Sequence, residues 1–524
     1  MVELVVCKKD SYFDSVTLMT LSSKLKKLPG VGDAVVSMAT TMNKELLENV
    51  GMLKGEAVDA GPNDLVVAIR AESQEQCDAA YGKIDELLHS TAEPQGSSEA
   101  PARTIREAKE RNPDLGVAIV SVKGEFAARE ARIALQNDMH VMLFSDNVSV
   151  EQERELKALA HEKGLLVMGP DCGTAILGGV GLCFANKMRQ GSIGLAAASG
   201  TGLQEVCVLI DKLGEGISQA LGTGGRDLSA EIGGMMMLDC IDLLDADPDT
   251  KVIVVVSKPP VEEVANKVRE RLARCSKPVV VCFIAGKRQD DALDADEGAG
   301  MTFASSLEDA AYRAVALARG EALASAEGTR FALDASLVAT EASRLGSGQR
   351  YLRALYCGGT LAAETLHECS KHMGELTSNV AKDPAMKVAD PFVSSGNCII
   401  DLGDDVFTAG RPHPMIEPGL RCERILQEAA DPACAVMLLD FELGYGSNPD
   451  PVGVTLPAIE QARALCRDAG RDIVFVGYVQ GTDGDDQGKA QQRALLAGAG
   501  VVLAESNLHA VSLALAIMKE REAR

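Results

Sequence analysis

Gly-rich turns that carry hydroxyl side chains occur at two points where an apolar run ends and a helical pattern begins. The first is Ser199-Gly200-Thr201-Gly202 after the run Ile193–Ala197, and the second is Gly358-Gly359-Thr360 after Leu352–Tyr356. Backbone N–H groups at a helix start, together with nearby hydroxyls, can bind a phosphate or a carboxylate. A tight turn in which Ser or Thr caps the helix is the alternative. We predict that both turns bind anions and face one shared cleft.

Two other Gly-containing loops carry charged groups. In Leu221–Ser229, Gly224 and Gly225 allow close approach to a ligand, and Arg226 can hold phosphate or carboxylate through two hydrogen bonds. A structural turn formed by Arg226 and Asp227 is the alternative. In Asp401–Asp405 and the following Gly410–Pro414, acids, a guanidinium and an imidazole fall within thirteen residues at a strand end, and a plain surface loop is the alternative. We predict catalytic roles for Arg226, Arg411, His413 and Asp404.

Other strand ends supply further candidates. Ser121, Lys123 and Gly124 follow an apolar run but do not form a G-x-G-x-x-G motif, and we predict that they contact a cofactor. Glu442, Asn448 and the loop Gly481–Asp486 occupy equivalent positions later in the chain. The spacing of Cys, His, Asp and Glu resembles no metal-ligand motif, so we predict no metal site.

The elements that must position these turns are parallel strands. Apolar runs separated by helical segments indicate sheets that are buried on both faces. These runs are Gly116–Val120, Val141–Phe144, Leu165–Met168, Ile193–Ala197, Val252–Val256, Val279–Ile284, Leu352–Tyr356, Cys398–Leu402, Ala435–Leu439, Ile473–Val476 and Val501–Leu503. They predict an α/β protein with doubly wound domains at residues 105–188, 189–318 and 348–520. Residues 1–90 predict a small ferredoxin-like α/β module, and 91–103 and 319–347 read as connections.

Composition limits the partners and the compartment. The formal net charge of −24 argues against nucleic acid but not against small anionic ligands. No uninterrupted apolar stretch is long enough to span a membrane. The 14 cysteines include no C-x-x-C pair, and no basic segment of a signal peptide begins the sequence. We therefore expect a reduced compartment and a cytoplasmic protein.

Several of these segments resemble one superfamily. Gly169-Pro170-Asp171-Cys172-Gly173-Thr174 is similar to the GPNC-type turn that follows the CoA-binding domain of succinyl-CoA synthetases, and Ser199–Gly202 to their phosphate-binding helix start. Leu221–Ser229, and Leu402–Asp405 with Gly410–Ile416, resemble blocks of the FdrA family of acyl-CoA synthetase-like proteins. The resemblance implies a CoA-binding Rossmann-like domain at 105–188 and two ligase-like domains, one α-like at 189–318 and one β-like at 348–520.

The sequence departs from the synthetases at the phosphoryl relay. In those enzymes a histidine on a Gly-His-Ala-Gly loop carries phosphate between sites. Here the corresponding stretch after Phe283 runs through Asp296–Gly300 to Ser305 without a histidine, and none occurs between His161 and His367. No segment resembles an ATP-grasp domain. Unaided ATP-driven CoA ligation is therefore not expected of this chain.

FdrA proteins are linked with anaerobic allantoin degradation as a subunit of oxamate carbamoyltransferase. The resemblance implies exchange of a carbamoyl group between oxalurate and phosphate, with no cofactor required, CoA as an optional ligand, small anionic substrates, companion subunits and an oligomer. Its partners would be carbamoyl phosphate, oxamate or oxalurate, or an acyl-CoA. The alternatives are a CoA ligase subunit whose partner supplies nucleotide and phosphate relay, and a regulatory scaffold that binds CoA or a metabolite.

Overall fold

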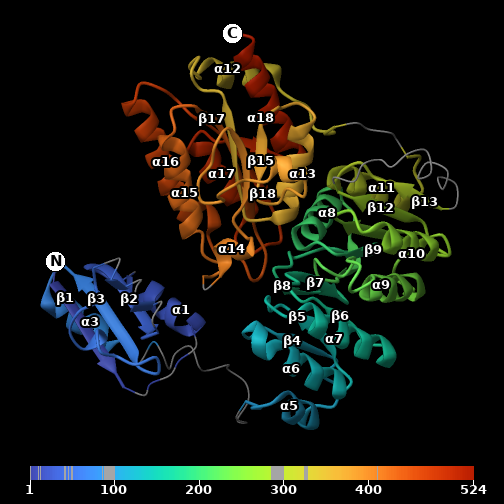
Figure 1. The fold of residues 1–524 in the computed structure, drawn as a ribbon, viewed down its shortest axis with the longest axis horizontal. Helices are drawn as coiled ribbons and strands as arrows, with labels where there is room; N and C mark the ends of the chain where they lie inside the picture. The colour runs from blue at the N-terminus through green and yellow to red at the C-terminus, as the bar shows by residue number, and fades with distance from the viewer. Residues whose placement is uncertain are drawn as a thin grey trace. The chain divides into compact units, whose positions relative to one another are not determined.

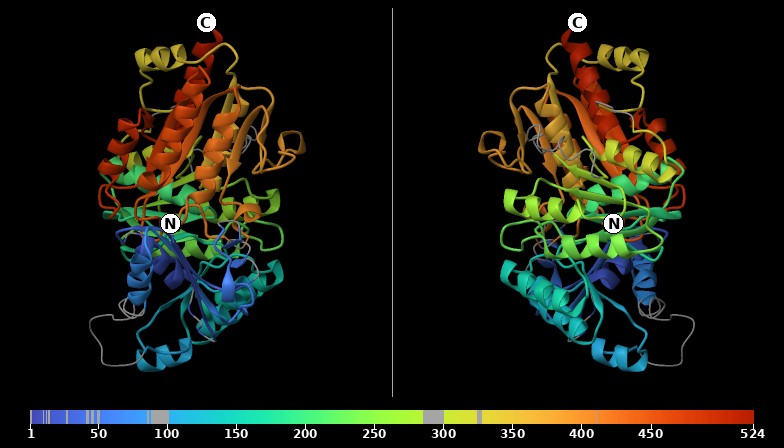
Figure 2. Two further views of the ribbon diagram at one scale, coloured as in Figure 1. Left: turned by 90° about the vertical axis from the view of Figure 1, so that its left-hand side faces the viewer. Right: turned by 90° about the vertical axis from the view of Figure 1, so that its right-hand side faces the viewer.

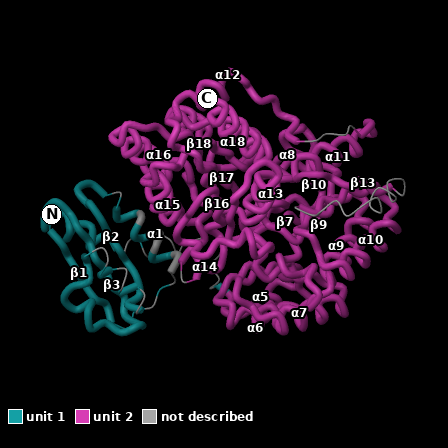
Figure 3. Tube along the Cα trace, turned by 45° about the horizontal axis from the view of Figure 1, so that its top comes forward, with its two compact units in different colours: residues 1–101 teal, residues 102–524 magenta. Residues whose placement is uncertain are grey.

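A computed structural model of the chain describes residues 2–9, 11, 13, 15–26, 28–40, 43–44, 47–48, 51–84, 87, 101–284, 300–323, 328–409 and 411–524. The chain divides into two compact units, residues 1–101 and 102–524 (Figure 3). In the described parts of the chain, no helix has both the length and the apolar character needed to cross a membrane. Residues 91–100 of the predicted connection at 91–103, and all of residues 285–299, lie outside the described residues.

The first unit is a three-stranded antiparallel sheet with strand order β1-β3-β2. Its elements are β1 (Val2–Lys8), α1 (Ser15–Lys26), β2 (Val31–Met38), η1 (Gly55–Ala57), β3 (Leu65–Ala71) and α3 (Gln74–Gly82). Strand β3 alternates between two buried clusters. Val67 and Ile69 face the helices, whereas Val66 and Ala68 face the segment that contains η1. Both faces of this small sheet are therefore covered, as its nearly continuous apolar sequence requires.

The second unit begins with a three-stranded parallel sheet of order β4-β5-β6. Its elements are α5 (Ile105–Arg111), β4 (Val117–Val120), α6 (Gly124–Gln136), β5 (His140–Leu143), α7 (Val150–Lys163) and β6 (Val167–Met168). Ser149 caps α7 by accepting a hydrogen bond from Gln152 N, and Gly164 ends the helix in the left-handed conformation. A cis peptide bond at Gly169–Pro170 follows β6 and leads the chain into the next sheet.

The next sheet has seven strands in the order β13-β12-β11-β9-β10-β7-β8. The strands are β7 (Thr174–Leu177), β8 (Val180–Cys183), β9 (Gln190–Ala197), β10 (Ile217–Gly222), β11 (Val252–Ser257), β12 (Val279–Phe283) and β13 (Met301–Phe303), and the helices are α8 (Gly200–Lys212), α9 (Met235–Ala246), α10 (Glu262–Leu272) and α11 (Leu307–Arg319). The strands from β9 onward are parallel, and the β7–β8 hairpin is antiparallel. Since β9 pairs with both β10 and β11, the strand order reverses beside β9, where ligands bind in open α/β sheets.

The last sheet has six parallel strands in the order β15-β16-β14-β17-β18-β19. These are β14 (Tyr351–Tyr356), β15 (Leu376–Ser378), β16 (Asn397–Asp401), β17 (Cys434–Glu442), β18 (Val474–Gln480) and β19 (Val502–Ala504). The other elements are α12 (Ala335–Ser343), α13 (Gly359–Ser370), η3 (Pro384–Met386), α14 (Asp405–Thr408), α15 (Gly419–Ala430), α16 (Pro451–Asp468), α17 (Lys489–Gly498) and α18 (Asn507–Glu522). A mixed seven-stranded sheet and a parallel six-stranded sheet, each with helices on both faces, confirm the α/β fold that the sequence predicts.

The two large sheets share one apolar core. Helices α8 and α11 lie on one face of the seven-stranded sheet and α13 and α18 on one face of the six-stranded sheet, and all four pack in the same buried cluster (Figure 1). Figure 2 shows the C-terminal helix α18 running along the strands of its sheet. Helices α15, α16 and α17 cover the opposite face of that sheet. Because α8 and α13 are packed together, their N-termini lie at a common edge of the two sheets.

Candidate functional site

The starts of α8 and α13 are in direct contact. Ser199 Oγ and Thr360 Oγ1 are 2.6 Å apart in a buried hydrogen bond. Ser199 also caps α8 by accepting from Gly202 N at 3.2 Å, and Thr360 N donates to Thr201 Oγ1 at 3.4 Å. The turns that we predicted as two facing anion sites therefore line one cleft, which confirms their shared placement. Ser199 therefore both caps α8, as the alternative interpretation holds, and lines the cleft.

Glycines make this approach possible. A Cβ atom on Gly202 would lie 2.4 Å from Ser199 Oγ and 2.9 Å from Thr360 Cγ2. A Cβ atom on Gly358 would lie 3.0 Å from Thr201 Cγ2. Larger residues at these points would force the two helix starts apart. The amide groups of each turn thus reach the same space only because the sequence has glycine there.

The cleft has a volume of about 460 Å³ and two cationic side chains among its lining residues. One is Arg411, which we predicted, and the other is Lys258, which we did not. Lys258 follows β11, on the side of β9 where the strand order reverses. Neither cationic group has a hydrogen-bond or ion-pair partner within the described ranges. A Lys at a strand end before two prolines was the sequence signal that could have identified Lys258.

One wall of the cleft is apolar and aromatic. Phe184 contacts both Phe144 and His413, with ring centroids 5.2 and 5.7 Å apart. His413 Nδ1 accepts a hydrogen bond from Met415 N at 3.2 Å, which places the proton of the neutral ring on Nε2. Burial lowers the pKa of His413 to about 4. The imidazole is therefore neutral near pH 7, and it can donate from Nε2 to a substrate oxygen.

Asp401 lies at the end of β16. It belongs to the predicted motif Asp401–Asp405, but we predicted no catalytic role for it. It lines the cleft, and burial raises its pKa to about 7, against the opposing effect of Lys258. Asp171 lines the same cleft, and burial, with Asp405 and Asp146 nearby, raises its pKa to about 6. The Asp171 side chain is solvent-accessible at the cleft, although surrounding atoms desolvate its carboxyl group. Two carboxyl groups here thus exchange protons near neutral pH.

Asp404 and Arg226, for which we predicted catalytic roles, make contacts that stabilise the fold. Asp404 caps α14 by accepting from Val406 N at 3.1 Å, and it is not among the cleft-lining residues. Arg226 Nε donates to the buried Glu153 at 2.9 Å, and its NH2 group donates to Val148 O at 2.7 Å. Both contacts hold the loop after β10 against α7 and the segment just before it. They match the structural alternative for Arg226 more closely than a ligand-binding role.

Of the other residues that we predicted for the site, some line the cleft and others do not. Ser121 and Gly225 line the cleft, whereas Lys123 and Gly124 form the start of α6 and are not in its lining. Gly224 has φ +86°, and a Cβ atom there would lie 2.6 Å from Pro170 O. Gly224 therefore serves the close passage of two backbone segments. Gly200, Thr201 and Gly359 line the cleft, whereas the predicted anion-binding residues Gly202 and Gly358 are not in its lining.

A buried polar network supports the turn before α13. The Asp440 carboxylate accepts hydrogen bonds from Cys357 N at 2.8 Å and Gly358 N at 2.9 Å. Arg421 donates to Cys357 Sγ at 3.0 Å. Cys357, Asp440 and Glu442 present possible metal ligands within 4.8 Å of one another. The Arg421 guanidinium contacts both Cys357 and Asp440. Burial raises the pKa of Glu442 well above its ordinary value, and Glu442 Oε1 has no hydrogen-bond partner among the described residues.

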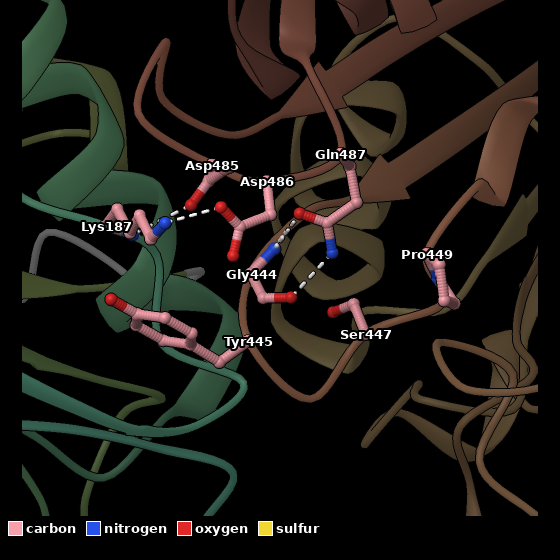
Figure 4. Close-up of a pocket in the computed structure, with 8 residues that line it drawn as sticks. All are labelled: Lys187, Gly444, Tyr445, Ser447, Pro449, Asp485, Asp486 and Gln487. Atoms are coloured by element: carbon pink, nitrogen blue, oxygen red, sulfur yellow. Dashed lines mark hydrogen bonds and ion pairs between the residues drawn. The ribbon is translucent and has the colours of Figure 1, made fainter.

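A second, smaller pocket of about 190 Å³ lies between the loops after β17 and β18 and the segment before β9 (Figure 4). Lys187 lies over the Tyr445 ring at 5.8 Å and pairs with Asp486 at 2.5 Å. Gln487 donates to Gly444 O and accepts from Gly444 N. Most polar groups of this pocket thus bind one another.

Family models match three parts of the chain. A model described as "CoA-ligase" matches residues 355–517, and one described as "CoA binding domain" matches residues 188–286. The second match covers β9 to β12, not the three strands at 117–168 to which we assigned a CoA-binding-like domain. A third model, described as "AllF, heavy metal-associated domain", matches residues 1–104. These matches support a chain with succinyl-CoA synthetase-like domains and a separate N-terminal module.

A full-length relative fixes the family. The chain is 47% identical over 512 residues to "Uncharacterized protein YahF" of Escherichia coli (strain K12), and the match covers 97% of each. The chain belongs to the YahF family. It is also 28% identical over 193 residues to "Succinate--CoA ligase [ADP-forming] subunit alpha 1" of Archaeoglobus fulgidus, a match that covers 35% of this chain and 62% of that relative. The solved apo structure of the dinucleotide-forming acetyl-coenzyme A synthetase 1 of Ca. Korarchaeum cryptofilum is 16% identical, with a TM-score of 0.34 over 82% of this chain and 88% of that one.

The N-terminal module of this YahF-family chain does not offer a thiol pair for a heavy metal. Its sequence has two cysteines, Cys7 and Cys77. Cys7 packs with the cluster on one face of the small sheet, and Cys77 is buried in the cluster on the other face. Burial also raises the pKa of the Cys7 thiol, which opposes the thiolate form that binds metals. The two sulfur atoms cannot meet at one ion.

Proposed function

We propose that this chain is an acyl-transferring subunit of the CoA-ligase type, and that its reaction takes place in the cleft between α8 and α13. The observation that supports it is the contact between Ser199 and Thr360, which joins two helix starts beside Lys258 and Arg411. Helix starts and cationic side chains together favour a phosphate or an acyl phosphate. The neutral His413 can donate to the carbonyl oxygen as negative charge develops on it.

The first candidate reaction is acyl transfer between an acyl phosphate and CoA. The two CoA-related family models and the succinate–CoA ligase relative favour it. A companion subunit would supply the nucleotide and the phosphate relay, because the sequence has no histidine between His161 and His367. The thiol of CoA would attack the acyl carbon and phosphate would leave. We place CoA at the carboxyl ends of β4 and β9, beside Ser121.

The second candidate is carbamoyl exchange between oxalurate and phosphate, which yields carbamoyl phosphate and oxamate. The FdrA-like sequence blocks and the AllF model at residues 1–104 favour it. This reaction needs a phosphate site, an anion site for the oxamate carboxylate and a proton carrier, but no phosphohistidine. Arg411 is suited to the carboxylate and the α8 and α13 amides to the phosphate.

One assay distinguishes the candidates. The full chain, alone and with the products of neighbouring genes, is given either oxalurate with phosphate or an acyl phosphate with CoA. Carbamoyl phosphate formation would support the second candidate, and acyl-CoA formation the first. Saturable CoA binding without either turnover would contradict both and favour a regulatory scaffold. The Arg411→Ala variant is the matched control. It lacks the side chain that we assign to the substrate, so the product that it still forms measures the background reaction.

A further inference from the structure

Asp401 occupies an unusual place at the start of α13. Its Oδ1 accepts a hydrogen bond from Gly403 N at 2.9 Å. Its Oδ2 lies against Gly359, where a Cβ atom would be only 2.4 Å away. No donor to Oδ2 is found among the residues that the structure describes. The second oxygen therefore lies at the cleft beside the N-terminus of α13, without a protein partner.

The backbone of Asp401 is held rigidly in this position. Asn379 Oδ1 accepts from Asp401 N, and Asn379 Nδ2 donates to Asp401 O, both at 2.9 Å. Asn379 is itself buried. The carboxyl group is thus placed by a side chain on another strand-end loop, which is how a reactive group is kept in a fixed orientation.

A neighbouring carboxylate shows what a purely structural role looks like. Asp440 accepts from the backbone N–H groups of both Cys357 and Gly358 and stabilises the turn before α13. Asp401 lacks this second set of donors, although it is 92% buried. Asp401 Oδ2 lies at the cleft instead, where it can take a proton or meet a ligand.

The surroundings of Asp401 set its proton affinity near neutrality. Burial is the largest cause of its raised pKa of about 7, and Lys258 opposes the increase. Charged groups near the Asp401 carboxyl are Lys258 after β11, Asp404 on the same loop and Asp440 on β17. The titratable residues Cys357 and His413 lie beside the neighbouring Gly403. Such a group accepts and releases a proton with little driving force in either direction.

We propose that Asp401 is the catalytic residue that carries the proton in the transfer reaction of this cleft. The inference rests on the proposed function and holds for both candidate reactions. In the carbamoyl exchange, a phosphate oxygen bonds to the carbamoyl carbon and the C–N bond to oxamate breaks. Asp401 Oδ2 takes the proton of HPO₄²⁻ and returns it to the oxamate nitrogen. In the CoA reaction the C–S bond forms, the C–O bond to phosphate breaks, and the same oxygen moves the thiol proton to phosphate.

Two other groups in the cleft are less suited to this step. His413 is already held in one tautomer by Met415 N, and its ring does not gain a proton near pH 7. Asp171 lies after the cis peptide at Gly169–Pro170, beside the three-stranded sheet, and it does not touch the α13 turn in the described contacts. Asp401 Oδ2 borders the helix start at Gly359, and Asp401 Oδ1 and His413 Nε2 both lie beside Gly403.

The test compares Asp401→Asn with the parent and with Asp383→Asn, an exposed capping residue of η3 in the same sheet domain. We expect Asp401→Asn to lose about 100- to 10,000-fold in kcat, the range for removal of a general acid–base. Its Kd for inorganic phosphate should change by less than about threefold, because the amides and cations remain. A plot of the parent's rate against pH should show an inflection near the pKa of Asp401, about 7. The Asp171→Asn variant should show the same inflection.

A second measurement does not need the variant to fold or to turn over. Sulfate is a dianion near pH 7 and has no proton to give, so its binding beside Asp401 should make the parent take up a proton, seen as a binding enthalpy that depends on the buffer. The Asp171→Asn variant should take up the same proton. Turnover with an unchanged rate in Asp401→Asn, or sulfate binding without proton uptake in the parent, overturns the inference and leaves the proposed function intact. A parent that neither turns over nor binds phosphate overturns both.

Discussion

Charged side chains around the cleft differ in whether the protein already uses them. Arg226 and Lys157 both pair with buried Glu153, and Lys157 also pairs with Asp227. Arg411 and Lys258 have no such partners in the described chain. A guanidinium that is held in two hydrogen bonds contributes to stability, whereas an unpaired one at a cleft is available to an anionic ligand.

The Arg411→Lys substitution tests this distinction. Lysine keeps the charge but loses the planar fork, so we expect about a ten- to a thousandfold loss of kcat/KM with an unchanged melting temperature. Arg226→Lys should behave in the opposite way. It should lower the free energy of unfolding by about 1 kcal/mol, because 44% of the Arg226 side chain is exposed, and leave kcat/KM nearly intact. Equal kinetic losses in the two variants would contradict the assignment.

The sequence predicted the position of the site better than its chemistry. The anion turns at Ser199 and Gly358 follow from apolar runs and glycines, which are local patterns. Asp401 was counted as part of a strand end, and its importance arises from contacts with Gly359 and Asn379, which are distant in sequence. Arg226 looked free because Glu153 lies 73 positions away. Burial and long-range partners decide such roles, and neither is visible in one segment.

At the scale of the elements, the first turns of α8 and α13 can lie in contact only because glycine lets their backbones approach closely. Replacing Gly202 by Ala places a methyl group 2.4 Å from Ser199 Oγ and 2.9 Å from Thr360 Cγ2. The overlap should cost about 1–3 kcal/mol of folding free energy and move α8 from α13. We expect phosphate affinity, measured by calorimetry, to fall at least about tenfold. Gly498→Ala in α17 is the control, since nothing lies within 4 Å of its added Cβ.

The junction of α13 with α11 and α18 should be sensitive to pH. Glu364 on α13 accepts from Leu307 N and Asn507 Nδ2, and burial raises its pKa from an ordinary 4.5 to about 8. The folded state therefore binds one proton more than the unfolded state between these values, and stability falls as pH rises from 4.5 to 8. Each unit of this separation is worth about 1.4 kcal/mol.

Melting temperatures near pH 5 and near pH 8.5 measure this effect. The parent should lose stability over this interval, and Glu364→Gln should lose clearly less, because it has no carboxyl group to ionise. Glu368→Gln on the same helix, where the side chain pairs with Lys371, should follow the parent. If Glu364→Gln shows the parent's full pH dependence, the carboxyl group is ionised in the folded protein and the network must be reassigned.

The elements that sequence analysis missed are short or lack apolar runs. Strand β10 contains Ser218 and Gln219, the β7–β8 hairpin contains Gly178 and Gly179, and β13 and β15 have three residues each. Their strand conformation comes from pairing with neighbours that are already in the sheet. The longer runs such as β11 and β17 were predicted because every residue in them is buried.

At the scale of the whole molecule, the two large sheets form one structural unit. Their shared layer of α8, α11, α13 and α18 buries apolar side chains from both sheets. It also buries polar groups that bond across the layer, as Glu205 accepts from Tyr478 Oη at 2.7 Å and from Asn507 N at 3.1 Å. A site formed by the starts of α8 and α13 can be rigid only if the two sheets do not move independently.

Separating the two halves should therefore prevent each from folding normally. We expect residues 348–524 expressed alone to bind the dye ANS strongly and to lack a cooperative melt, because α13 and α18 would expose their apolar faces, and Glu364 would lose its contact with Leu307. Residues 102–524 should fold and retain phosphate binding, since the N-terminal module is a separate compact unit with its own core. Mixing residues 102–347 with 348–524 during refolding should restore a single complex on size exclusion, with the melting temperature of residues 102–524. Two halves that each fold alone, with sharp melts and no dye binding, would show that the four-helix layer is an ordinary domain interface, and the cleft would then have to be regarded as one that opens and closes.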